Sequence, residues 1–252
     1  MSARKIEFLI AGVQKGGTSA LFEYLREMPG LQLPDVKEVH FFDDETIDWS
    51  RPNYGCYHAH FTQDGRMWGE ATPIYSYWPN ALERIAAYNP AMRLILLFRD
   101  PVQRAWSHWK MEYAKGKETE PFAWCIREGR ARVAAGDPAA PGHHRVFSYV
   151  ERGFYAGQVE RALELFPREQ CLFLNSERLR DDPAAVLASI CRFLNQPPPA
   201  AVTPRKLHVG ADIAYPSRLR LDDITLLRNI YATDVQQFLN LTGIDAQDWS
   251  AN

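Results

Sequence analysis

A lysine, two glycines and two hydroxyl residues follow one another behind a short apolar run near the N-terminus. Phe8 to Ala11 has the length and apolar character of a buried strand, and Gly12 ends it. The residues after it that could do chemistry are Lys15, Gly16, Gly17, Thr18 and Ser19. Glycines let backbone N–H groups approach an anion, and hydroxyls at a helix N-terminus add donors where the dipole favours phosphate. The stretch therefore predicts a phosphate cradle.

This cradle departs from the usual nucleotide-binding loop. Gly12 and Gly17 have the spacing of Gly-x-x-x-x-Gly-Lys-[Ser/Thr], but Thr18 stands where that motif has its lysine. Lys15 lies two residues before the second glycine, so we expect it to contact a different oxygen of a nucleotide. A P-loop-type kinase of nucleotides or small molecules remains an alternative, and so does a plain strand–turn–helix with a surface lysine.

A second candidate anion site follows the strongest predicted strand. Arg93 to Phe98 is almost continuously apolar, as expected for the centre of a parallel sheet. Asp100 and Pro101 fit the N-cap and the first position of a helix. Arg99 argues against a Mg²⁺ site because its charge repels the ion, whereas it suits an anion at the carboxyl end of a central strand. Ser107, two turns into the helix, could donate to the same anion.

Glu38 and His40 belong to a short segment of mixed polarity, Lys37 to Asp43. In an extended chain alternate side chains point the same way, so Glu38 and His40 would share one face. A carboxylate beside an imidazole is suited to remove and carry a proton. On this segment alone, an edge strand with a solvated polar face is the simpler interpretation.

Strands and helices alternate along the chain, which predicts an α/β fold with three layers and a mostly parallel sheet. The expected strands cover 8–11, 68–73, 93–98 and 170–174; the expected helices cover 19–28, 80–88, 101–113, 122–133, 149–166, 183–194 and about 223–241. The 252 residues show no compositional break, so we expect a single domain over residues 1–252. Ala134 to Arg145 is expected to be a mobile loop, and whether it closes over a substrate is open.

Composition narrows the function classes. A net charge of −2 disfavours a nonspecific nucleic-acid binder. No apolar run has the length of a membrane span, and the N-terminus lacks a signal-peptide pattern. The four cysteines are scattered, without a Cys-x-x-Cys pair, which favours a reduced, cytoplasmic protein without structural zinc. The pair His143–His144 is more simply a solvated pair than a metal site.

Four segments occur in a recognisable order: Gly12–Leu21, Lys37–Asp43, Glu70–Tyr75 and Leu97–Ser107. Together they resemble the sulfotransferases that use 3′-phosphoadenosine 5′-phosphosulfate (PAPS), and most of all the branch that modifies heparan sulfate glucosamine, with its bacterial relatives. The first segment looks like that family's 5′-phosphosulfate loop, and the last looks like its 3′-phosphate motif. The resemblance implies a P-loop-like fold, PAPS as the donor and 3′,5′-ADP as the product.

The resemblance also implies roles for the matching residues. Cofactor-binding roles fall on Lys15, Gly16, Gly17, Thr18, Ser19, Arg99, Ser107 and Tyr215. Among these, Lys15 would also be catalytic, because it would stabilise charge on the leaving group. Glu38 matches the family's general base and His40 a second catalytic residue, and His40 and Asp43 match residues on the acceptor side.

Sulfuryl transfer places less negative charge at the reacting centre than phosphoryl transfer, so a lysine and backbone amides can suffice where kinases recruit Mg²⁺. We therefore expect a metal-independent sulfotransferase that acts on a hydroxyl or amine of a small or carrier-bound acceptor. Carbohydrate, lipid and natural-product acceptors all remain open. The oligomeric state and the adenosine contacts of residues 206–216 also remain open.

Overall fold

The computed structural model describes residues 4–136, 142–203, 213–246 and 249. The chain forms two compact units. The sheet unit comprises Met1–Phe98 and Glu160–Leu207, and the helical unit comprises Arg99–Val159 and His208–Asn252. The expected single domain over residues 1–252 therefore stays a prediction.

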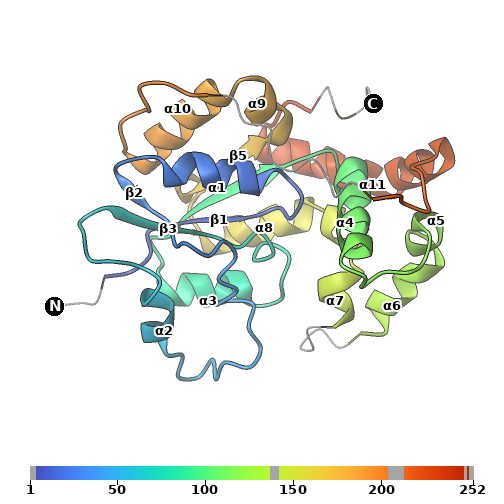
Figure 1. Cartoon of the computed structure of the whole chain (residues 1–252), viewed down its shortest axis with the longest axis horizontal. Helices are drawn as coiled ribbons and strands as arrows, with labels where there is room; N and C mark the ends of the chain where they lie inside the picture. Colours follow the sequence, from blue (N-terminus) through green and yellow to red (C-terminus); the bar gives the residue numbers. More distant parts are fainter. Residues whose placement is uncertain (1–3, 137–141, 204–212, 247–248, 250–252) are drawn as a thin grey trace. The chain divides into compact units, whose positions relative to one another are not determined.

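The sheet unit is built on five strands in the order β2-β3-β1-β4-β5, and every pair is parallel (Figure 1). The strands are β1 (Phe8–Gly12), β2 (Leu31–Gln32), β3 (Met67–Ala71), β4 (Arg93–Phe98) and β5 (Cys171–Asn175). After β1 the chain forms β2 and β3 on one side, then β4 and β5 on the other. The carboxyl ends of β1 and β4 therefore mark the point where such sheets bind ligands. The expected α/β fold is confirmed.

Helices cover this sheet because each parallel connection must cross over a face. Helices α1 (Thr18–Arg26) and α10 (Pro183–Leu194) bury their apolar sides in one cluster with the sheet, which includes Ile10, Leu25 and Ile190. Helix α3 (Ala81–Tyr88) lies on the other side of the sheet (Figure 1). Two short helices, α2 (Tyr54–His58) and α9 (Ser176–Asp181), complete the unit.

The helical unit packs around Trp109, Tyr149 and Tyr231. Its helices are α4 (Pro101–Ala114), α5 (Phe122–Cys125), α6 (Ala131–Ala134), α7 (His143–Val146) and α11 (Leu221–Thr242), with 3₁₀ turns at Glu128–Arg130 and Glu151–Gly153. The carboxylate of Asp100 accepts the N–H of Gln103 at 2.7 Å. The expected N-cap of α4 is therefore confirmed.

Two expected helices differ from the structure. The helix expected over 122–133 is divided into α5, a 3₁₀ turn and α6, because Arg127, just before the turn, has non-helical φ and ψ values of −114° and −98°. The helix expected over 149–166 is α8 (Ala156–Leu165) and starts late. Asp234 of α11 accepts the N–H groups of Tyr155 and Ala156 at 2.6 and 3.2 Å, so its carboxylate fixes that start.

Some expectations concern residues outside those described. The expected mobile loop over 134–145 contains the start of α7, and its residues 137–141 lie outside the described ranges. Most of the stretch 206–216 also lies outside them, although Tyr215 is described. Within the described ranges, no helix is long and apolar enough to cross a bilayer.

Candidate active site

Residues Gly12–Ser19, called here the lysine loop, run from the last residue of β1 through a turn into the first two residues of α1. Main-chain hydrogen bonds fold it onto β4. The N–H of Val13 donates to the carbonyl of Leu97 at 3.1 Å, and the N–H of Gly16 donates to the carbonyl of Val13 at 2.9 Å. Lys15 has a φ of +69°, a left-handed conformation that is costly for a residue with a Cβ. The loop therefore keeps Lys15 in a conformation that an isolated chain would avoid.

The two loop glycines are required for different reasons. A Cβ on Gly16 would lie 2.2 Å from the carbonyl oxygen of Leu97, so this glycine is needed for packing against β4. Its N–H is already donated inside the loop, which differs from the expectation that it approaches an anion. Gly17 has a φ of +94°, which favours glycine, and it turns the chain into α1.

The N-terminus of α1 fits a phosphate. Gly17 is the N-cap and provides no side-chain hydrogen bond, and the first turn contains no acidic residue. The first N–H groups of a helix have no intrahelical acceptor, and the positive end of the dipole adds to their attraction for an anion. Thr18 and Ser19 occupy the first two positions of the helix. This set of backbone and hydroxyl donors is of the kind that a 5′-phosphate needs.

Residues Lys37–Asp43, called here the Glu38 segment, do not form the extended strand that alternation suggested. Glu38 and His40 have φ values of +66° and +58°, so the backbone turns at both residues. The N–H of Glu38 donates to the carbonyl of Ala71 at 3.0 Å, at the carboxyl end of β3. The expectation that Glu38 and His40 lie together is confirmed, but the reason is this turn and not a shared strand face.

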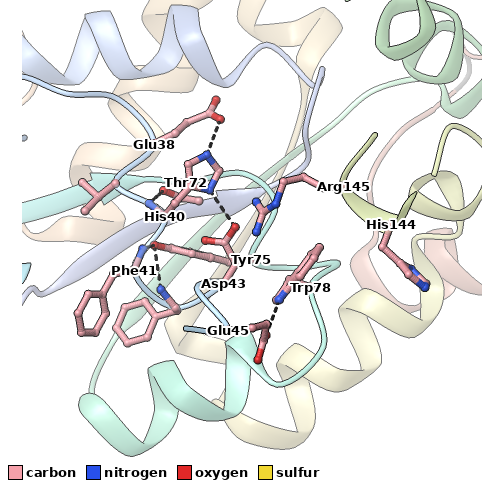
Figure 2. Close-up of polar contacts among 12 residues, drawn as sticks. Glu38, His40, Phe41, Asp43, Glu45, Thr72, Tyr75, Trp78, His144 and Arg145 are labelled. Carbon is pink, nitrogen blue, oxygen red and sulfur yellow. Dashed lines mark hydrogen bonds and ion pairs between the residues drawn. The ribbon is translucent and has the colours of Figure 1, made fainter. Parts of the chain in front are cut away.

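Glu38, His40 and Asp43 form a continuous polar chain (Figure 2). The Nε2 of His40 lies 3.5 Å from Oε2 of Glu38, and its Nδ1 lies 2.8 Å from Oδ2 of Asp43. Lys37 forms an ion pair with the other carboxylate oxygen of Glu38. Exposure increases away from the core: the side chain of Asp43 is 0% exposed, whereas those of Glu38 and His40 are 32% and 42% exposed.

These contacts shift both pKa values. Burial raises the pKa of Glu38, but the hydrogen bond with His40 and the charge of Lys37 outweigh it and lower the pKa to about 2. Burial lowers the pKa of His40, but hydrogen bonds with Asp43 and Glu38 outweigh it and raise the pKa to about 9. At neutral pH the imidazole is therefore a cation held between two carboxylates.

A buried carboxylate beneath the Glu38 segment was missed as a site residue. Glu70 on β3 is 0% exposed and lies beside Thr72 and Tyr75, which are equally buried. In the sequence this stretch served only to support the resemblance. A glutamate inside an otherwise apolar strand was the signal that could have found it, because buried carboxylates need a reason.

The residues expected near the far end of the nucleotide belong to the helical unit. Arg99 directly follows β4, and its carbonyl accepts the hydroxyl of Tyr155 at 2.9 Å. Ser107 is half-buried on α4. The ring centre of Tyr215 lies 6.1 Å from the ring centre of Trp109, a residue of α4. The Nζ atom of Lys110, also on α4, lies 5.8 Å from the ring centre of Tyr215. The shared 3′-phosphate expected for Arg99 and Ser107, and the adenosine contact expected for Tyr215, stay predictions.

No cluster of three or more His, Cys, Asp or Glu side chains in the described ranges is arranged to hold a metal ion. That a metal is not required stays a prediction.

The chain matches known sulfotransferases in sequence and in structure. The family model for the sulfotransferase domain matches residues 5–207, so the chain belongs to the sulfotransferase family. Human heparan sulfate glucosamine 3-O-sulfotransferase 3B1 is 34% identical over 189 residues, which cover 74% of this chain and 45% of that protein. Mouse heparan sulfate glucosamine 3-O-sulfotransferase 6 is 34% identical over 212 residues, which cover 82% of this chain and 57% of that protein.

A solved sulfotransferase from Alicyclobacillus acidocaldarius superposes with a TM-score of 0.80 at 25% identity, covering 98% of this chain and 99% of that one. The expected membership of an enzyme family of sulfotransferases, with its α/β fold, is thereby confirmed. The chain spans about half the length of the curated relatives it matches.

Proposed function

We propose that this chain transfers the sulfuryl group of PAPS to a hydroxyl or amine of a carbohydrate, lipid or natural-product acceptor. One observation carries the proposal most. The lysine loop continues β1, and the Glu38 segment is bonded to the end of β3, which is the neighbouring parallel strand. The loop proposed to hold the anion and the carboxylate proposed as the base therefore lie at adjacent strand ends, at the edge where such sheets bind ligands.

The donor, when bound, supplies an activated sulfuryl group and a phosphate that leaves. The N–H groups at the start of α1, with Gly17, Thr18 and Ser19, would hold the 5′-phosphate. The ammonium of Lys15 would stabilise the charge on the leaving group. By the family resemblance, Arg99 and Ser107 would hold the 3′-phosphate and Tyr215 the adenosine.

On the acceptor side, Glu38 would take the proton from the attacking hydroxyl or amine. Its low pKa makes it a weak base in the free protein, and general bases work best with a pKa near the working pH. We infer that acceptor binding loosens the contact of Glu38 with Lys37, which raises the pKa of Glu38. His40 would orient Glu38, and Asp43 would hold His40 in its charged form.

The relatives that match this chain are 3-O-sulfotransferases of glucosamine, which favours a sugar hydroxyl among the open acceptors. The family also favours a sulfuryl donor over ATP. A P-loop-type kinase stays the alternative that the same loop would serve, and it differs in needing ATP with Mg²⁺.

Calorimetry distinguishes the two activities. We expect 3′,5′-ADP to bind without added metal more tightly than ATP with Mg²⁺, and Arg99→Ala to abolish that binding. Transfer of labelled sulfate from PAPS to a panel of sugar, lipid and natural-product acceptors then tests turnover. Tighter binding of ATP with Mg²⁺, or phosphate transfer from ATP, would contradict the proposal.

A further inference from the structure

Five consecutive backbone N–H groups of the Glu38 segment, from Glu38 to Phe42, donate to a single stretch of chain. That stretch is the end of β3 and the turn after it, residues 70–75. The first of these, the N–H of Glu38, donates to the carbonyl of Ala71. The next four N–H groups donate to side chains, which is unusual because backbone groups mostly form hydrogen bonds with other backbone groups.

The side-chain acceptors come from Glu70, Thr72 and Tyr75, called here the frame. The N–H of Val39 donates to Oε1 of Glu70 at 3.4 Å, and the N–H of His40 donates to the hydroxyl of Thr72 at 3.3 Å. The N–H groups of Phe41 and Phe42 donate to the hydroxyl of Tyr75 at 3.1 and 3.4 Å. Figure 2 shows Thr72 and Tyr75 next to the segment.

The carboxylate of Glu70 accepts hydrogen bonds from two neighbouring hydroxyl groups. The hydroxyl of Thr72 donates to Oε1 of Glu70, and the hydroxyl of Tyr57 donates to its Oε2 at 3.1 Å. With its single proton donated to Glu70, the hydroxyl oxygen of Thr72 presents its lone pairs to the N–H of His40, so Glu70 sets the direction of this hydroxyl. Glu70 is fully buried, so its charge is costly unless these donors are present.

We propose that Glu70, acting through Thr72, is a positioning residue that holds Glu38 and His40 in the left-handed conformation in which their side chains meet. Left-handed residues with a Cβ persist only where the surroundings over-determine them. Here the frame accepts the N–H on either side of the bend at His40. Without it the segment would relax, and Glu38 would separate from His40.

This inference rests on the proposed function for its consequence on turnover, but its structural part is independent of any activity. The charged groups that touch the imidazole of His40 include Glu38 and Asp43, and Lys37 is paired to Glu38. A loosened segment moves these groups apart, so the titration of His40 reports the frame directly. Burial raises the pKa of Glu70 to about 7 against its hydrogen bonds with Thr72 and Tyr57. Glu70→Leu removes both acceptor oxygens and keeps the approximate size of the side chain.

The test uses the full chain and a matched pair of variants. Thr72→Val removes the hydroxyl and keeps the shape, whereas Thr72→Ser keeps the hydroxyl. Histidine-labelled NMR, assigned with a His40→Gln sample, follows the imidazole of His40 from pH 5 to 10. We expect its pKa to stay near 9 in the wild type and Thr72→Ser, and to fall toward about 6.5 in Thr72→Val and Glu70→Leu.

Turnover and donor affinity are measured on the same samples. We expect Thr72→Val and Glu70→Leu to lower kcat by up to about 10²-fold, as misplaced catalytic groups do. The affinity for 3′,5′-ADP should stay unchanged because the lysine loop is untouched. Tyr75→Phe, which removes one oxygen, replaces either variant if it fails to fold. A His40 pKa that stays near 9 in every frame variant would overturn the inference. A wild type without sulfate transfer would instead overturn the proposed function, while the titration would still test the frame.

Discussion

The lysine loop and the Glu38 segment both contain left-handed residues with a Cβ, but they are held by opposite means. Main-chain hydrogen bonds and the close packing of Gly16 on Leu97 shape the lysine loop. Side chains of the frame shape the Glu38 segment. If the proposed function is right, the loop would bind its ligand through a fixed backbone shape, whereas the segment would act through ionised side chains. Substitutions should therefore affect the two regions in separable ways.

Glu38→Gln gives the largest expected effect. The amide keeps the size of the side chain but cannot accept the acceptor proton, so turnover should fall by about 10²–10⁴-fold. Affinity for 3′,5′-ADP should stay unchanged, because the lysine loop is shaped by its own backbone. Initial rates with PAPS and calorimetry with 3′,5′-ADP measure the two quantities. Glu164→Gln, on the exposed side of α8, is the control; equal losses of turnover and affinity in Glu38→Gln would remove the distinction between the regions.

Glu70→Gln should change the pH dependence of stability. The folded pKa of about 7 lies above the ordinary value of 4.5, so the folded protein holds a proton that the unfolded chain has lost. Wild-type stability should therefore decrease as the pH rises from 4.5 to 7, by about 3 kcal/mol at most. In the variant this slope should be absent, although lost hydrogen bonds add a constant offset. Urea unfolding at several pH values measures the free energy of unfolding, and so gives both the pH slope and the offset. If this free energy changes with pH in the same way in the two proteins, Glu70 does not titrate in this range.

Gly16→Ala tests the shape of the lysine loop. The added Cβ would lie 2.2 Å from the carbonyl of Leu97, and overpacking of this kind costs about 1–3 kcal/mol. The loop must shift, so affinity for 3′,5′-ADP should fall by about tenfold or more, while the pKa of His40 stays near 9.

The matched control for this variant is Gly157→Ala, because a Cβ at that exposed position meets nothing within 4 Å. It should bind 3′,5′-ADP like the wild type. If Gly16→Ala also binds normally, the tight packing on β4 does not shape the anion site.

Elements with local signals could be predicted from the sequence. The apolar run of β4 and the Asp-Pro pairs at the starts of α4 and α10 carry their own boundaries, and the structure has Asp100 and Asp182 as the caps. The glycines of the lysine loop were likewise found from their spacing. The strand and the two caps depend on residues that are close in the chain, so a sequence pattern contains them. The packing of Gly16 on Leu97 does not, and spacing alone could not predict it.

Features fixed by distant residues could not be predicted. The start of α8 depends on Asp234, which lies 78 positions beyond Ala156. The bends at Glu38 and His40 depend on acceptors about 31 positions away, in Glu70 and Thr72. Alternating polarity in this segment suggested a strand. The pattern does not contain the information that the backbone N–H groups donate to side chains and not to the backbone of a neighbouring strand.

His40→Gln gives the smallest expected effect and isolates the charge of the Glu38 segment. The folded pKa of about 9 lies above the ordinary 6.5, so the stabilisation by the imidazolium is complete below pH 6.5 and is lost as the pH rises through 9. Because the side chain is 42% exposed, solvent screening reduces this difference to on the order of 1 kcal/mol.

His58→Gln is a control with the opposite sign. Burial lowers the pKa of His58 on α2, so its contribution to stability is lost as the pH falls below 6.5 and not as the pH rises. Urea unfolding between pH 5.5 and 9.5 measures the free energy of unfolding of the wild type and the two variants. As the pH rises, the stability that the wild type gains from His40 should decrease, whereas the stability that it gains from His58 should increase. If the difference for His40→Gln does not shrink as the pH rises, the segment is held by its frame alone and not by the ion pairs of His40.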